Sequence, residues 1–119
     1  ELKVENAIIK LSEIECISDE LNKYLRKNSP DNAAMAFADL GRFLCNNFQK
    51  FRKEEKKEIF TAIEELISSN DEKINTLVAT MLLEAFINCW ISSGFKKEYR
   101  DFLGTSSLLF LDELEKFYS

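Results

Sequence analysis

Carboxylates are the main chemically competent side chains of this chain, which has 21 acidic residues, 16 basic residues and no histidine. The lack of histidine removes the commonest general base and metal ligand, and it excludes every His-dependent catalytic triad. The three glycines are too far apart to form a phosphate-binding loop. These features predict a protein that is not an enzyme, with no catalytic residue, no metal and no cofactor.

The three cysteines have neither zinc-site spacing nor the paired spacing of a disulfide framework. Each of Cys16, Cys45 and Cys89 stands beside apolar residues at helical spacing. Small buried thiols in a reducing compartment are therefore the expected state of all three.

Most of the acidic residues have an ordinary structural interpretation. Glu54, Glu55 and Glu58 alternate with lysines, which is typical of a solvated helix face with pairs four residues apart. Glu64 and Glu65 are expected on the same exposed face, opposite the apolar stripe of their helix. A helical enzyme that uses carboxylates and a divalent metal is the least favoured alternative, because Glu-x-x-His motifs cannot occur here.

Glu84 differs, because it interrupts a segment that is apolar on almost every side. With Thr76, Thr80 and Asn88 it forms a narrow polar ridge at spacings of four residues. A buried carboxylate there needs hydrogen-bond partners, whereas an exposed one is suited to anchor a partner protein. The sequence leaves both interpretations open.

A few other polar residues are candidates for contacts with a basic partner. Asp71 and Glu72 begin the apolar segment, where capping and the helix dipole are their default roles. Asp39 has Arg42 three residues on, so a local ion pair is its default. The candidate binding residues are Asp39, Asp71, Glu72, Asn75 and Glu84.

The elements that must position these residues all have helical periodicity, and long alternating β patterns are absent. Val4 to Asn28 carries one apolar stripe with a possible break near Ser18. Asn70 suits an N-cap for the segment up to Ser93, and Thr105 suits one for the last helix. The predicted helices span residues 4–28, 32–49, 53–69, 71–93, 96–103 and 105–118.

Two adjacent segments, 53–69 and 71–93, read as one helical hairpin with a short turn. The second is nearly apolar all round, which predicts the central helix of the domain. Gly41 is expected to permit close helix approach. Short connections make successive helices antiparallel, so we expect a single all-α domain over residues 1–119, built as a HEAT-like stack of five to six helices. A compact helical bundle is the alternative.

The net charge of −5 argues against nucleic-acid binding and is suited to a basic partner. No run of about 18 uninterrupted apolar residues is present, so no membrane partner is expected. No secretory signal is visible, and a cytoplasmic location is predicted.

Several segments resemble a group of small all-helical bacterial proteins. They are residues 38–44 (ADLGRFL), 77–85 (LVATMLLEA), 102–107 (FLGTSS) and 112–118 (DELEKFY). Some members of the group are similar to immunity proteins that are encoded beside toxins of contact-dependent growth inhibition or related polymorphic toxin systems. The resemblance implies a cytoplasmic protein that binds one cognate toxin and blocks it.

The expected function is thus an immunity protein that neutralises a cognate toxin by occlusion, as a monomer or as a heterodimer with the toxin. A nuclease is the expected toxin class, because enzymes that grip phosphates are commonly basic. The alternative is a generic HEAT-like adaptor that docks a peptide or helix. Its expected feature is an exposed apolar strip involving Leu83 and Ile87.

Overall fold

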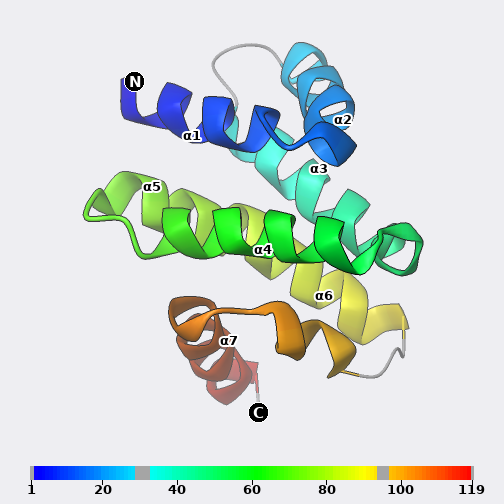
Figure 1. Ribbon diagram of the computed structural model, residues 1–119. Coiled ribbons are helices and arrows are strands. Elements are labelled where there is room, and N and C mark those ends of the chain that lie inside the picture. Colours follow the sequence, from blue (N-terminus) through cyan, green and yellow to red (C-terminus); the bar gives the residue numbers. More distant parts are fainter. Residues whose placement is uncertain (1, 29–32, 94–96, 119) are drawn as a thin grey trace.

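Helices account for nearly all of the described chain, which comprises residues 2–28, 33–93 and 97–118 of the computed structural model (Figure 1). No β-strand occurs in these residues, so the all-α fold class is confirmed. The α-helices are α1 (Leu2–Ser12), α2 (Glu15–Lys27), α3 (Ala33–Asn46), α4 (Lys53–Ile67), α5 (Glu72–Leu77), α6 (Glu84–Ser93) and α7 (Thr105–Tyr118). Between them lie the 3-10 helices η1 (Phe48–Lys50) and η3 (Lys97–Phe102) and the π-helical turn η2 (Val78–Leu83).

The central element is the continuous helix Glu72–Ser93, formed by α5, η2 and α6. It runs antiparallel to α4, as the hairpin pattern predicts (Figure 1). Helices α1, α3, α4 and α7 all contact it, which confirms its central position. Its buried side chains recur at every fourth residue: Ile74, Val78, Leu82, Phe86 and Trp90.

By length and composition this helix could also cross a membrane. Its apolar character has another explanation here, because the buried stripe forms the core between α3, α4 and α7. The molecule measures 34 × 30 × 23 Å and is consistent with a soluble protein. The described helices pack as a compact bundle around this helix, and a regular HEAT-like stack stays a prediction.

Aromatic rings fill one end of the core. Phe48, in the 3-10 turn after α3, lies 4.8 Å from Trp90 between ring centroids and 6.1 Å from Phe60. Tyr99 of η3 closes the cluster 5.1 Å from Trp90. The Lys56 ammonium lies 4.3 Å above the Phe48 ring, so a cation–π contact covers the cluster on the solvent side.

Gly41 allows α3 to approach the central helix closely, as expected from its sequence position. A Cβ atom at this position would overlap the Leu82 carbonyl oxygen and lie 3.1 Å from the Ala85 Cβ. The backbones therefore touch where only glycine leaves room.

Several expected helix boundaries differ from the structure. The first break comes at Glu13 and Ile14, not near Ser18, because the Ile14 side chain turns into the core in an extended conformation. Asp71, not Asn70, is the N-cap of α5. The helix predicted to reach residue 49 ends at Asn46 and tightens into η1. The sequence also favours a cap by Asp31 or Asn32 for the helix that follows them and a C-terminal cap by Gly94 for the central helix, and these residues lie outside the described ones.

Candidate interaction surface

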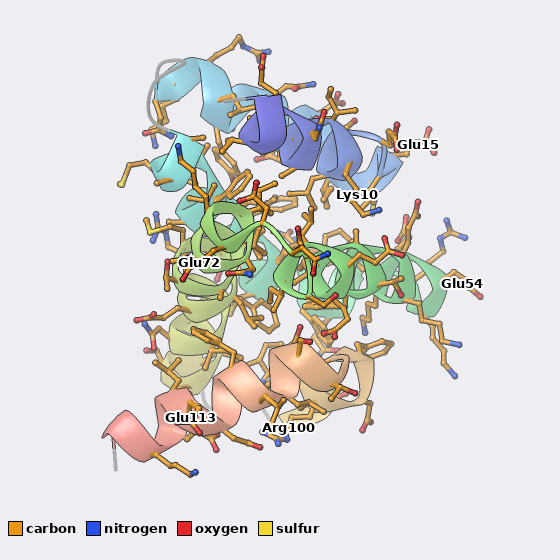
Figure 2. All side chains as sticks on the ribbon, turned by 90° about the vertical axis from the view of Figure 1, so that its left-hand side faces the viewer. Lys10, Glu15, Glu54, Glu72, Arg100 and Glu113 are labelled. Carbon is orange, nitrogen blue, oxygen red and sulfur yellow. The ribbon has the colours of Figure 1, made fainter. Side chains whose placement is uncertain are left out.

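The polar ridge predicted around Glu84 is present on the exposed side of the central helix. Thr76, Thr80 and Asn88 are exposed, and Glu84 is half-buried. Glu72 is exposed one turn before Thr76, and it extends the row toward the start of α5 (Figure 2). We call these five residues the ridge: Glu72, Thr76, Thr80, Glu84 and Asn88.

The π-helical turn keeps the ridge on one side of the helix. In a regular α-helix, residues four apart drift by about 40° around the axis, because each turn takes 3.6 residues. A π turn takes more residues per turn and reverses part of this drift. As a result, one row stays buried from Ile74 to Trp90 while the other stays at the surface from Glu72 to Asn88. Inside the ridge, the Thr80 hydroxyl donates to the Thr76 carbonyl oxygen at 2.7 Å.

Two hollows border the ridge. The larger, of about 1000 Å³, lies between α1, the start of α3 and the α5–η2 segment. Its wall is apolar, and its polar edge carries two carboxylates and one ammonium group. The apolar residues include Val4, Ile8, Leu77 and Met81, and the charged ones are Glu5, Glu72 and Lys73. We call it the α1–α5 groove.

The smaller hollow, of about 360 Å³, lies between α3 and the second half of the central helix. Glu84 and Cys89 of the central helix and Arg42 of α3 line it. Thr80 and Met81 line both hollows, so the two adjoin at these residues. The ridge and the hollows together form one surface that can receive a partner.

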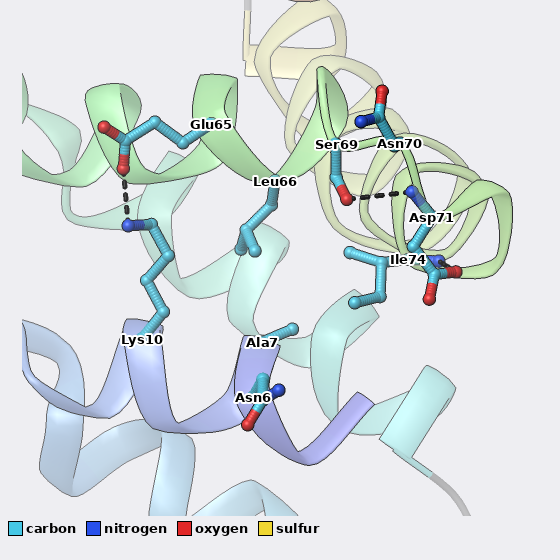
Figure 3. Close-up of a pocket in the computed structure, with 9 residues that line it drawn as sticks. All are labelled: Asn6, Ala7, Lys10, Glu65, Leu66, Ser69, Asn70, Asp71 and Ile74. Carbon is cyan, nitrogen blue, oxygen red and sulfur yellow. Dashed lines mark hydrogen bonds and ion pairs between the residues drawn. The ribbon is translucent and has the colours of Figure 1, made fainter. Parts of the chain in front are cut away.

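A third hollow, of about 670 Å³, lies on the other side of α1, against the α4–α5 turn (Figure 3). Lys10 on α1 forms an ion pair with Glu65 on α4 across it. On the far side the Asp71 amide donates to the Ser69 hydroxyl at 3.0 Å. Charges inside this hollow are thus already balanced by contacts within the chain.

Two predicted binding residues stabilise the α4–α5 turn. The Asp71 carboxylate accepts hydrogen bonds from the Lys73 and Ile74 amides at 2.9 and 3.2 Å, which satisfies two free N–H groups of the first turn. The Asn75 side chain donates to the Ser69 carbonyl oxygen at 3.1 Å. Both residues are half-buried at the end of the ridge nearest Glu72.

Asp39 lies apart from the ridge and joins α2 to α3. It accepts a hydrogen bond from the Asn28 side chain at 3.0 Å and forms ion pairs with Arg42 and Lys27. Burial alone would raise the pKa of Asp39. The bonds from Asn28 and Arg42, together with the charges of Lys27 and Arg42, outweigh burial and lower this pKa below its usual value.

The carboxylate that the sequence analysis misplaced is Glu64. It was expected on a solvated face, but it is half-buried and caps α7 from across the fold. Its two oxygens accept hydrogen bonds from the Ser106 amide at 2.9 Å and the Ser107 amide at 3.0 Å. Thr105, the expected cap, is instead the first residue of the helix.

Gly104 is the residue in the sequence that indicates the contact between Glu64 and the start of α7. A Cβ at Gly104 would overlap the Glu64 side chain, so the glycine leaves room for the carboxylate. Burial would raise the pKa of Glu64, but its bonds to Ser106 and Ser107 reverse this and lower it. Glu65, by contrast, is exposed, as expected.

The sequence analysis also made predictions about an exposed apolar strip and about metal ligands. Leu83 and Ile87 are fully buried, so the exposed apolar strip expected at these positions is wrong. Both side chains lie beside the main buried stripe of the central helix. Within the described residues, no group of three or more His, Cys, Asp or Glu side chains could hold a metal ion.

The fold and this surface define a small all-α domain with an acidic ridge on its central helix. The chain belongs to the family described as Domain of unknown function (DUF7674), whose profile matches residues 9–119. No curated protein and no solved structure shows significant similarity to the chain.

Proposed function

We propose that this chain is a bacterial immunity protein that binds and neutralises one cognate toxin by occluding it, without catalysis. The single observation that carries the proposal is the acidic ridge bordered by two open hollows. Such a surface offers carboxylates for orientation and apolar walls for affinity, as binding interfaces require. The resemblance of residues 33–118 to a group of small helical bacterial proteins, some of which are similar to immunity proteins, supports the same function.

The charge of the chain favours a basic partner. A nuclease that grips phosphates presents a basic cleft, and an acidic inhibitor is steered toward it. Glu72 and Glu84 are the two carboxylates of the ridge, about three turns apart, and would meet such a cleft first. Because exposed charges act mainly on the association rate, their effect falls as salt concentration rises. Function in the cytoplasm, where a toxin acts on nucleic acid, belongs to this proposal.

Asp71, Asn75 and Asp39 have a smaller part in the proposed contact. Each already stabilises the fold through bonds within the chain, so a partner would meet groups that are held in place. We assign orientation to them and the leading electrostatic role to Glu72 and Glu84.

The test begins with co-expression of the chain and the product of the adjacent gene, followed by affinity purification of the chain. A stoichiometric complex with a large secreted toxin, and complete loss of toxin activity at equimolar chain, are the expected results. A toxin that stays fully active beside excess folded chain contradicts the proposal.

Matched charge reversals then locate the surface. The double variant Glu72→Lys/Glu84→Lys is expected to weaken the complex by more than about tenfold, a change of about 1.4 kcal/mol. The control Glu54→Lys/Glu113→Lys changes the net charge equally at exposed positions away from the ridge (Figure 2). Equal weakening by both pairs would show that only total charge matters.

The second candidate is an adaptor that docks a peptide or helix, and the apolar wall of the α1–α5 groove favours it. Val4, Ile8 and Leu77 line that wall. An adaptor would bind a segment from a signalling or metabolic partner and would leave toxin activity unchanged. The identity of the neighbouring gene and the toxin-activity assay separate the two candidates.

A further inference from the structure

Two cysteines lie on the helices that meet at Gly41. Gly41 of α3 meets Ala85 of α6, where an added Cβ would lie 3.1 Å from the Ala85 Cβ. Cys45 and Cys89 each follow these residues by four positions, which is one turn further along the contacting faces of both helices. The close approach set by Gly41 therefore extends to the two thiols.

A side-chain contact brings the Cys89 thiol to the end of α3. This thiol donates to the Asn46 side-chain oxygen at 3.5 Å, which places Cys89 beside the residue that follows Cys45. Cys89 is also close enough to raise the pKa of Cys45. Cys45 is 2% exposed, whereas Cys89 is half-buried and lines the smaller hollow beside the ridge. The Cys89 thiol is thus partly accessible to solvent, whereas the Cys45 thiol is buried.

We propose that Cys45 and Cys89 form a reversible disulfide that joins α3 to α6 when the chain meets a small disulfide oxidant. A disulfide needs α-carbons within about 7 Å, and helices whose backbones touch at Gly41 provide this approach. The inference rests on helix packing alone and is independent of the proposed function.

The chemistry proceeds by two thiol–disulfide exchanges. The Cys89 thiolate attacks one sulfur of glutathione disulfide, whose S–S bond breaks, and one glutathione leaves. The Cys45 thiolate then attacks the Cys89 sulfur and releases the second glutathione. Two protein thiols are oxidised, one glutathione disulfide is reduced to two thiols, and the two protons pass to the released glutathione.

The second exchange is the slow one. Burial is the largest cause that raises the pKa of Cys45, and it persists after Cys89 has taken up glutathione. Little Cys45 thiolate exists at neutral pH, so formation of the cross-link is expected to accelerate as pH rises.

The reaction of the full chain with glutathione disulfide tests the inference. The expected product is a monomer that has lost two hydrogens in mass, retains one of its three thiols and yields a Cys45–Cys89 cross-linked peptide. Reduction should restore all three thiols. A chain that keeps three thiols, or that stops at glutathionylated Cys89 at every pH, would overturn the inference.

Cys16 provides the matched control, since it lies on α2 and its charged neighbours are Glu55, Glu58 and Arg52 of the α4 region. The Cys16→Ser variant should still lose both remaining thiols together. Cys89→Ser and Cys45→Ala should each lose the ability to form the internal cross-link. Pairing of Cys16 with either cysteine, or dimers joined through Cys89, would contradict the proposed Cys45–Cys89 disulfide. If Cys45→Ala does not fold, the mass and the cross-linked peptide of the oxidised wild type still test the proposal.

Discussion

The amide and the hydroxyl of Ser107 both donate to the same carboxylate oxygen of Glu64, at 3.0 and 2.9 Å, although the residues are 43 positions apart. Glu64 thereby supplies the N-terminal acceptor that α7 lacks in its own sequence. Ser107 is fully buried, so the bond also satisfies a hydroxyl group that has no access to water. The last helix is held to the bundle through this carboxylate.

Replacement of Glu64 by alanine should lower the free energy of unfolding by about 1–2 kcal/mol, because buried amide groups of α7 lose their acceptor. Urea denaturation followed by circular dichroism measures the change. The neighbouring variant Glu65→Ala is the control. It removes only an ion pair with Lys10 in which the Glu65 side chain is 56% exposed, and it should cost less than about 1 kcal/mol. Equal losses in the two variants would contradict the capping role.

The lowered pKa of Glu64 predicts a pH dependence of stability. The folded state favours the ionised carboxylate, so its contribution is complete above the ordinary pKa of 4.5 and is lost as pH falls through the lower folded value. The stability gap between wild type and Glu64→Gln should therefore be constant near neutral pH and shrink below 4.5. Denaturation series over this range measure it. A gap that is unchanged at about pH 3 would be inconsistent with this assignment.

Gly41→Ala should destabilise the chain although alanine favours a helix by about 1 kcal/mol. The new methyl group would overlap the Leu82 carbonyl oxygen, and α3 must move away from the central helix. We expect a net loss of about 1–3 kcal/mol, as for other overpacked cores. Met35→Ala, at a 42% exposed position of the same helix, should change little in the same denaturation assay. A stabilised Gly41→Ala variant would refute the close approach.

Asp71 allows its capping role to be separated from partner binding. Asp71→Ser retains a capping oxygen and removes the charge, whereas Asp71→Ala removes both. The alanine variant should lose about 1 kcal/mol of stability, and the serine variant should stay within a few tenths of wild type. If Asp71 also touches the toxin, Asp71→Ser weakens the complex at unchanged stability, and calorimetric titration with the toxin measures this. Similar instability of both variants would show that the charge, not the cap, stabilises the turn.

Helical periodicity was sufficient to predict the all-α class, the α4 hairpin and the central helix, because these depend on where apolar residues recur. The close approach of α3 to the central helix could be predicted because Gly41 is a small residue among bulky apolar ones. The ridge followed from the four-residue spacing around Glu84. These features are local or depend on a single stripe.

Features that depend on distant residues were missed. Glu64 looks like any exposed acid until α7 is placed beside it, since its partners are more than 40 positions away. The break between α1 and α2 at Ile14 arises because this side chain is buried in a core formed by other helices, which the local sequence does not reveal. The exposed strip of Leu83 and Ile87, expected for an adaptor, is absent because both side chains pack into the core, and the packing of distant helices around them is not visible in local periodicity.

The π turn also constrains how chains of this kind can change length. Deletion of one residue within Val78–Leu83 would let the turn close to an α-helix with little rotation of the helix that follows, because a π turn holds one residue more than an α turn. Deletion of Asn88 in α6 would instead rotate Trp90 by about 100° away from the interior. A lineage that keeps this core can therefore lose a residue at the π turn with less damage than elsewhere in the central helix.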